Sequence, residues 1–314
     1  IVQTRALLQL DVPIVIWNTQ ISRGLKPGED FDIVMVNSGA AGIPELSNAL
    51  LRAGRPFAFI TGHALDETTL GELAEYAAAA RVVKKLRQAR IGLLGHTYQG
   101  MTDLMIDQYS LRHVMGPLVW QIELEELGAT TAEVADSEAK ALADELGSQW
   151  DISEVEPERF LRSVKLILAY QRLIKRHRLD AVCSFDQALL SDRRIGIAPP
   201  LATSWLTGQG VPFTCELDIP TAVAMLIMQE LAGQSTFLEY LVIDFDNNAV
   251  LLSHDGHGNP ELATSPRDVK IKASIYYRGV HGYGAAGEYS YRTGDVSMLA
   301  VASVGCKGWR LISG

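Results

Sequence analysis

The sequence predicts an α/β protein with two doubly wound, parallel-sheet (Rossmann-like) domains followed by a β-rich C-terminal domain. Over about the first 220 residues, short β-branched runs alternate with long helical patterns, which is typical of βαβ units on a parallel sheet. After Gly233, strand patterns continue without helices long enough to connect parallel strands. We therefore expect domains at 1–88, 89–233 and 234–314.

Each expected domain has its own series of elements. In the first domain, apolar runs predict buried strands at 12–17, 33–36 and 57–60, with helices at 43–53 and 66–89. The second domain is expected to have strands at 91–95, 119–124, 181–184 and 212–215, and helices near 100–114, 135–147, 156–178 and 219–232. Strand patterns in the third domain cover 237–254, 269–278, 288–302 and 309–313. The chain begins and ends inside or just after such patterns, so we expect both terminal domains to be incomplete.

Composition excludes several classes of function. The chain has 28 Lys and Arg against 37 Asp and Glu, a net charge of −9, which disfavours nucleic acid and anionic membranes as partners. No stretch approaches the roughly 20 apolar residues that cross a bilayer. Cys183, Cys215 and Cys306 lie far apart and form neither a disulfide framework nor a Cys-x-x-Cys pair. A cytoplasmic location fits this pattern best.

Polar residues just after predicted strands are candidate ligand contacts, since open α/β sheets bind ligands at the carboxyl ends of their strands. The loop 95–101 contains Tyr98 and Gln99 but no nucleotide-binding motif. Asp218 follows the strand at 212–215, where it is expected to cap the next helix. Glu216 lies before that cap, and a structural and a ligand-binding role are equally open for it.

The segment 237–254 is interpreted as a β-hairpin with Asn247 and Asn248 in the turn. This register pairs Leu241 with His254 and places Glu239 diagonally across from His254, about 7–8 Å away on the same apolar face. A buried carboxylate needs a compensating partner. The carboxylate is therefore in an ion pair with His254, on a sheet face partly open to water, or part of a metal site. Mn²⁺, or Mg²⁺ or Co²⁺ in its place, suits carboxylate and imidazole ligands.

Other candidate residues are less specific. The sequence supports a ligand role for His257 no more than a role outside the site. His281 lies in a glycine-flanked loop. Neither a Gly-x-Ser-x-Gly motif nor a histidine close in sequence to Cys215 supports a serine or cysteine nucleophile.

The order Cys215-Glu216-Leu217-Asp218, an apolar helix, Phe237-Leu238-Glu239, a hairpin and His254 resembles the L-fucose isomerase and L-arabinose isomerase family. The resemblance implies interconversion of aldoses and ketoses with Mn²⁺. It also implies that Glu216 and Glu239, which stand 23 residues apart, bind the metal together with His254. Looser similarity covers 89–103 and 282–298.

The same resemblance implies sugar contacts and an assembly. Trp17, positioned like a tryptophan that some members present to a neighbouring subunit, would contact the sugar, as would Tyr98, Gln99 and His281. A homotrimer or homohexamer is implied as well. The segment 36–42 departs from the Asn-Gln-x-x-His pattern of arabinose isomerases, which puts L-arabinose in doubt as the substrate. The family's further histidine ligand is either replaced by His281 or lies outside this sequence.

These observations lead to one hypothesis and one alternative. The hypothesis is a metal-dependent sugar isomerase that works through an ene-diol, with Glu216 and Glu239 acting as base and acid as well as metal ligands. The alternative is a non-catalytic, two-lobed sugar-binding protein, which needs neither the metal nor the two glutamates.

Overall fold

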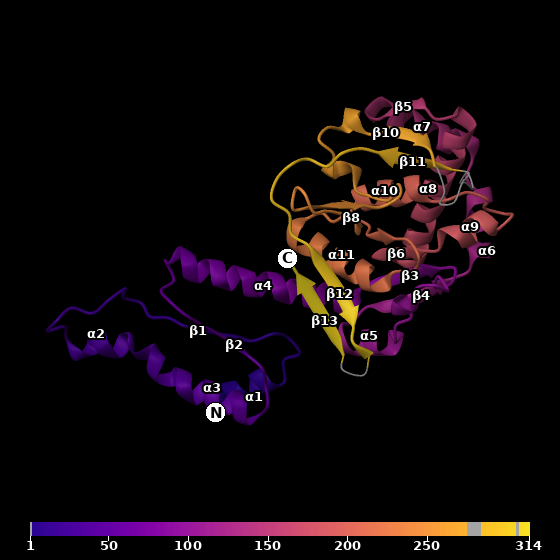
Figure 1. Ribbon diagram of the computed structural model, residues 1–314. Coiled ribbons are helices and arrows are strands. Elements are labelled where there is room, and N and C mark those ends of the chain that lie inside the picture. Colours follow the sequence, from indigo (N-terminus) through magenta and orange to yellow (C-terminus); the bar gives the residue numbers. More distant parts are fainter. Residues whose placement is uncertain (1, 275–283, 306–307) are drawn as a thin grey trace. The chain divides into compact units, whose positions relative to one another are not determined.

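The computed structural model describes residues 2–274, 284–305 and 308–314 (Figure 1). The chain divides into two compact units, residues 1–84 and 85–314. The architecture is mixed α/β, with parallel sheets and a C-terminal region rich in strands. No helix in the described part of the chain has both the length and the apolar character needed to span a bilayer.

The first unit has a small parallel sheet in which β1 (Val15–Asn18) pairs with β2 (Ala58–Thr61). Ile14, Ile16 and Leu50 form its buried core. Its helices are α1 (Val2–Leu8), α2 (Phe31–Val36), η1 (Ser38–Gly42), α3 (Ile43–Arg52) and the start of α4 (Glu67–Gln88). Two paired strands do not make a doubly wound sheet, so the expected architecture of this part is not seen.

The predicted strand at 33–36 is wrong, because these residues belong to helix α2. The Asp30 side chain accepts a hydrogen bond from the Asp32 N–H and caps the helix. All four side chains at 33–36 are exposed in this unit. A short apolar run has no periodicity that separates a strand from a helix, and the capping residue decided between them.

The second unit contains a four-stranded parallel sheet in the order β4-β3-β6-β7. Its strands are β3 (Arg90–Leu94), β4 (Leu118–Ile122), β6 (Ala181–Ser184) and β7 (Phe213–Thr214). The helices along this part are η2 (Thr102–Leu104), α5 (Gln108–Val114), α6 (Leu124–Ala132), α7 (Asp136–Gln149), α8 (Pro157–His177), α9 (Asp186–Ser191), α10 (Pro200–Gly208) and α11 (Ile219–Ala232). These strands and the longer helices lie close to the predicted ranges.

Helix α8 anchors the core of this unit. Its buried face includes Phe160, Val164, Ile167 and Tyr170, at the three- and four-residue spacing of an amphipathic helix. The Tyr170 ring meets Phe213 of β7 edge to face, with ring centroids 5.0 Å apart. This contact ties the strand that leads to Glu216 to the largest hydrophobic cluster.

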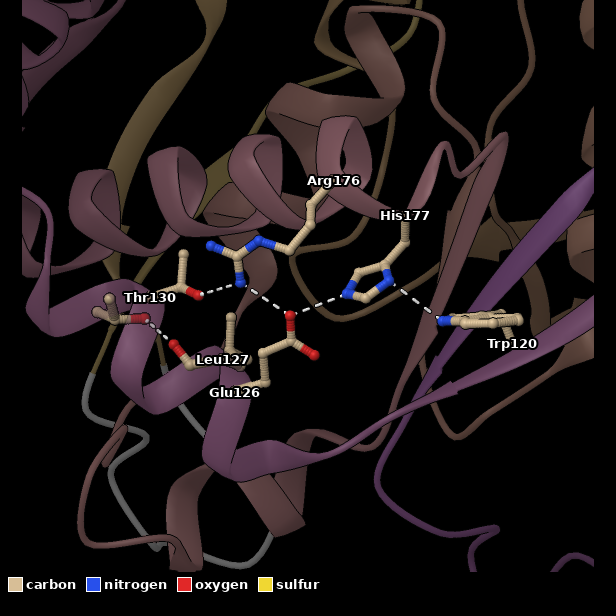
Figure 2. A network of polar contacts seen from close by, with 7 residues as sticks. Trp120, Glu126, Leu127, Thr130, Arg176 and His177 are labelled. Atoms are coloured by element: carbon tan, nitrogen blue, oxygen red, sulfur yellow. Dashed lines mark hydrogen bonds and ion pairs between the residues drawn. The ribbon is translucent and has the colours of Figure 1, made fainter.

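A polar network holds the C-terminal end of α8 against α6 and β4 (Figure 2). The Glu126 carboxylate accepts hydrogen bonds from Arg176 at 2.8 Å and from His177 Nε2 at 2.9 Å. The Trp120 indole N–H donates to His177 Nδ1, which leaves Nε2 to carry the proton. Burial favours the neutral carboxyl, but the hydrogen bonds from Arg176 and His177 and the charge of Arg176 outweigh it and lower the pKa of Glu126.

The C-terminal region joins the same unit through shared sheets. Strand β10 (Lys270–Ala273) pairs with β11 (Ala285–Glu288) and, in parallel, with β5 (Asp151–Glu154). The remaining strands form hairpins, β8 (Glu239–Asp244) with β9 (Ala249–Ser253) and β12 (Leu299–Ser303) with β13 (Trp309–Ser313). Short helices η3 (Pro260–Leu262) and η4 (Pro266–Asp268) lie between β9 and β10. The strand β5 was missed, since its partner is more than a hundred residues away.

The hairpin β8–β9 forms, but its predicted register is wrong. Its loop has four residues, 245–248, so Ile243 pairs with Val250 rather than Leu252. A bulge at Leu241 then brings Glu239 opposite Ser253. Both faces of the hairpin are exposed in this chain. The exposed side chains include Leu241, Ile243 and Phe245, which form the apolar face that was expected to be buried.

Candidate metal and sugar site

A cavity of about 880 Å³ lies where β3, β6 and β7 end and the C-terminal segment returns. Its position follows the rule for parallel sheets, since the loops after these strands supply part of the lining. The lining is rich in acidic and aromatic side chains. It includes Tyr98, Phe185, Asp186, Cys215, Glu216, Glu239, His254, Asp255, His257, Lys272, Glu288, Tyr289 and Tyr291.

Glu216 is held in a strained turn after β7. Glu216 and Leu217 both have positive φ, 58° and 61°, a conformation that is uncommon for non-glycine residues and is enriched at functional sites. The Leu217 N–H donates to the Ser184 carbonyl and fixes the turn against β6. Asp218 then caps α11 by accepting from the Thr221 N–H at 2.8 Å, as predicted. The turn holds the Glu216 carboxylate at the cavity wall.

The hairpin brings Glu239 and His254 to the same wall. Glu239 begins β8 and His254 follows β9, and their Oε2 and Nε2 atoms lie 4.0 Å apart. Ligand atoms of Glu216, Glu239 and His254 all lie within 4.8 Å of one another. Despite the altered register, the structure brings the three predicted residues together.

The electrostatics of this cluster favour a cation. Burial, followed by the negative charges of Glu239, Asp186 and Asp218, raises the pKa of Glu216 to about 7. The pKa of Glu239 is also raised, mainly by burial. Burial and the neighbouring His257 lower the pKa of His254 to about 3, so its imidazole is neutral and able to act as a ligand. Crowded carboxylates beside a neutral imidazole are a donor set that a divalent cation would satisfy.

Cys215 lies closer to this cluster than the sequence suggested. Its Sγ is 3.1 Å from His254 Nε2, although no histidine is near it in sequence. The thiol is buried, and burial, followed by the charges of Asp186 and Glu216, raises its pKa well above the usual value. This pairing therefore holds a neutral thiol rather than an activated nucleophile.

His257 and Asp186 are also part of the cavity wall. His257 Nε2 and Asp186 Oδ2 lie 2.9 Å apart, and both side chains are buried. Sequence reasoning left His257 open and missed Asp186. The strand-end rule that selected Glu216 would also have found Asp186, because it lies two residues after β6.

The loop that carries both histidines is closely packed around Gly256. Gly256 has φ of +68°, and a side chain there would come within 2.8 Å of Ala286 and 3.0 Å of Pro200. The buried Ser204 hydroxyl donates to the Gly256 carbonyl and accepts from the Gly258 N–H. These contacts hold His257 from both sides.

The remaining predicted sugar contacts have different outcomes. Tyr98 lines the cavity and packs edge to face on Phe185. Gln99 is exposed and is not among the lining residues. Trp17 lies in the first unit, where its indole N–H donates to the Gly62 carbonyl, and its contact with sugar stays a prediction. His281 lies outside the described residues.

Comparison with known proteins points to sugar isomerases. The chain is 26% identical over 274 residues to a sulfoquinovose isomerase from Priestia aryabhattai, covering 85% of this chain and 59% of that protein. A sulfoquinovose isomerase from Alkalicoccus urumqiensis is 23% identical over 315 residues, covering 98% and 67%. An L-arabinose isomerase from Acidothermus cellulolyticus is 25% identical over 244 residues, covering 74% and 48%. No protein-family model matches the chain.

These similarities support the sugar-isomerase part of the predicted resemblance, at low identity. The fucose isomerase part stays a prediction. The chain spans about 59% of the length of the Priestia aryabhattai relative. The substrates and the assembly of the protein are therefore proposed below.

Proposed function

We propose that the protein is a metal-dependent isomerase that interconverts an aldose and a ketose. The observation that carries this proposal is the convergence of Glu216, Glu239 and His254 within 4.8 Å at the wall of the cavity. The sulfoquinovose and L-arabinose isomerase names of its relatives support the same reaction class. The cavity volume of about 880 Å³ lies in the range of pockets that hold small molecules.

The donor set fits a hard or borderline divalent ion, and we propose Mn²⁺, with Mg²⁺ or Co²⁺ as substitutes. Glu216, Glu239 and His254 would hold it. A bound cation would polarise the carbonyl and the adjacent hydroxyl of an open-chain sugar, which acidifies the hydrogen on the carbon between them.

The two glutamates would move the proton. Glu216 would act as the general base and take the hydrogen from C2 of an aldose, with its pKa set by the bound cation. Glu239 would deliver a proton to C1, while the proton of the C2 hydroxyl passes to the C1 oxygen. Atoms balance, since one hydrogen leaves C2 and one arrives at C1.

The decisive experiment measures ketose formation from a panel of aldoses, including L-arabinose, L-fucose and sulfoquinovose, in the presence of Mn²⁺. We expect Glu216→Gln and Glu239→Gln to lower turnover by about 100-fold or more, because general acid–base groups contribute that much. Glu145→Gln, on the exposed surface of α7, is the matched control. Full turnover by Glu216→Gln, or by protein treated with EDTA, would refute the mechanism. Sugar binding that needs neither metal nor the glutamates, without turnover, would favour the non-catalytic binding protein instead.

We also propose a homotrimer or homohexamer. The hairpin β8–β9 leaves Leu241, Ile243 and Phe245 between 52% and 86% exposed in the single chain, and apolar surface of this kind is common at subunit interfaces. Sedimentation of the purified protein would test this, and a monomer at micromolar concentration would contradict it.

A further inference from the structure

A second possible ligand set lies directly beside the proposed metal centre. Ligand atoms of Cys215, His254 and His257 also lie within 4.8 Å of one another. This set offers one sulfur and two imidazole nitrogens, whereas the first set offers two carboxylates and one imidazole. The two sets differ in the metals that they favour, since thiolate and imidazole ligands select Zn²⁺ and related thiophilic ions.

The second set has the supporting structure of a metal site. Asp186 Oδ2 lies 2.9 Å from His257 Nε2, the arrangement in which a carboxylate accepts the N–H of a ligating histidine and fixes its tautomer. That tautomer leaves a lone pair on His257 Nδ1. His257 is only 4% exposed, and its Nδ1 is buried with no hydrogen-bond partner in the described part of the chain. A buried nitrogen without a partner is costly unless a ligand fills it.

The thiol is also placed for coordination. Cys215 Sγ and His254 Nε2 lie 3.1 Å apart, whereas a sulfur and a nitrogen bound tetrahedrally to one Zn²⁺ lie about 3.5 Å apart, given bonds of about 2.3 and 2.0 Å. A small outward shift of either side chain would therefore admit the ion.

We propose that Cys215, His254 and His257 form a binding site for a thiophilic divalent cation such as Zn²⁺ or Cd²⁺, which competes with the hard-metal centre for His254. Coordination replaces the S–H bond of Cys215 with a sulfur–metal bond, and the proton leaves to solvent. The imidazoles contribute lone pairs and lose no proton. The same nitrogen, His254 Nε2, faces both Cys215 and Glu239, and one lone pair binds one metal ion, so the two modes exclude each other.

The test is a titration with Co²⁺, a spectroscopic substitute for Zn²⁺, of the metal-free Glu239→Gln protein. Co²⁺ also suits the carboxylate centre, and this variant removes one ligand of that centre. The cysteine variants titrated with Co²⁺ are made in this background. We expect about one Co²⁺ per chain to produce a near-ultraviolet thiolate-to-cobalt charge-transfer band, which Cys215→Ser abolishes. Cys183→Ser and Cys306→Ser are the matched controls and should keep the band. Cys183 is a second buried thiol, which donates to the Asp218 carbonyl, and Cys306 is the third cysteine of the chain. Binding without the band, or a band that survives in Cys215→Ser, would overturn the proposal.

Two further variants keep the proposal testable should Cys215→Ser fail to fold. His257→Gln removes a nitrogen but keeps the thiol, and should weaken Co²⁺ binding by about 10- to 100-fold, as should Asp186→Asn through His257. Glu216→Gln should keep the cobalt band while weakening Mn²⁺ binding. Unchanged Co²⁺ affinity in His257→Gln would refute its role as a ligand.

Competition is measured without turnover, from the electron paramagnetic resonance signal of free Mn²⁺. In the wild type, one equivalent of Zn²⁺ should release bound Mn²⁺, and about 100-fold more Zn²⁺ should be needed in Cys215→Ser. Equal release from both proteins would refute competition through the thiol. Neither readout depends on isomerase activity. The competition rests on the proposed Mn²⁺ centre, whereas the cobalt band tests the thiolate site even in a protein that binds no Mn²⁺.

Discussion

Replacing Glu216 with Gln is expected to stabilise the metal-free protein at pH 8. The pKa of Glu216 rises from 4.5 in a solvated side chain to about 7 in the fold. Between these pH values the native protein keeps a proton that the unfolded chain has lost, so the free energy of unfolding falls as the pH rises. Above pH 7 the Glu216 carboxylate is charged in the native state, and the full cost of placing that charge in the site lowers the free energy of unfolding. Gln has the same shape and no charge, so the variant avoids this penalty.

The magnitude follows from the same values. A carboxyl whose pKa moves from 4.5 to about 7 destabilises the native state by at most about 3 kcal/mol. Glu216 is only partly buried, and solvent screening reduces the expected effect to about 1–2 kcal/mol. The turn that holds it has a positive φ in both proteins, so backbone strain largely cancels in the comparison. The variant and the wild type should therefore have similar stability at pH 4.5 and diverge by pH 8.

The assay is urea-induced unfolding, followed by circular dichroism, at several pH values from 4.5 to 8. Each measurement is made with EDTA and with saturating Mn²⁺, and Glu145→Gln serves as the control for replacing an exposed glutamate. Mn²⁺ at 100 times its Kd stabilises a protein that binds it by about 2.7 kcal/mol, so with Mn²⁺ the wild type should become the more stable protein. An equal difference between the proteins at pH 4.5 and pH 8 in EDTA would refute the reasoning, as would a variant that Mn²⁺ stabilises as much as the wild type.

Three further changes test the packing that positions the site, each by thermal or urea unfolding. Gly256→Ala should lower the free energy of unfolding by about 1–3 kcal/mol, because the new Cβ would lie 2.8 Å from Ala286. Gly208→Ala, whose nearest contact is at 3.4 Å, should lower it much less. Equal losses of stability in the two variants would contradict this. Phe213→Ala should cost about 3–5 kcal/mol, since the ring is fully buried, and a cost below 1 kcal/mol would show that the site relaxes. Glu126→Gln should lower the free energy of unfolding by about 1 kcal/mol at pH 7. Because the pKa of Glu126 is lowered, this difference in stability from the wild type should shrink as the pH falls below 4.5. A difference that does not depend on pH would be evidence against the network in Figure 2.

Local patterns in the sequence predicted most elements of the α/β fold. Helices α4 and α8 follow from their length and periodicity, and the Asp218 cap follows from its place before an apolar helix. These features depend on neighbours within a few residues. The short run at 33–36 was mistaken for a strand, and β5 was missed. Both errors arise in short segments that have no distinctive hydrophobic period, so that packing against the rest of the chain decides whether they form a helix or a strand.

The candidate site shows the same division. The strand-end rule selected Glu216, and the hairpin placed Glu239 near His254. The resemblance to the L-fucose and L-arabinose isomerase family then grouped all three as neighbours. Two contacts at the site join distant segments. Cys215 and His254 are 39 residues apart in the sequence, and Asp186 and His257 are 71 residues apart. Contacts at this separation depend on how the loops pack around Gly256 and Ser204. The sequence by itself therefore determined the types of chemical group and their approximate place, whereas only tertiary packing decided which of them face each other, because side-chain contacts between distant segments have no local signal.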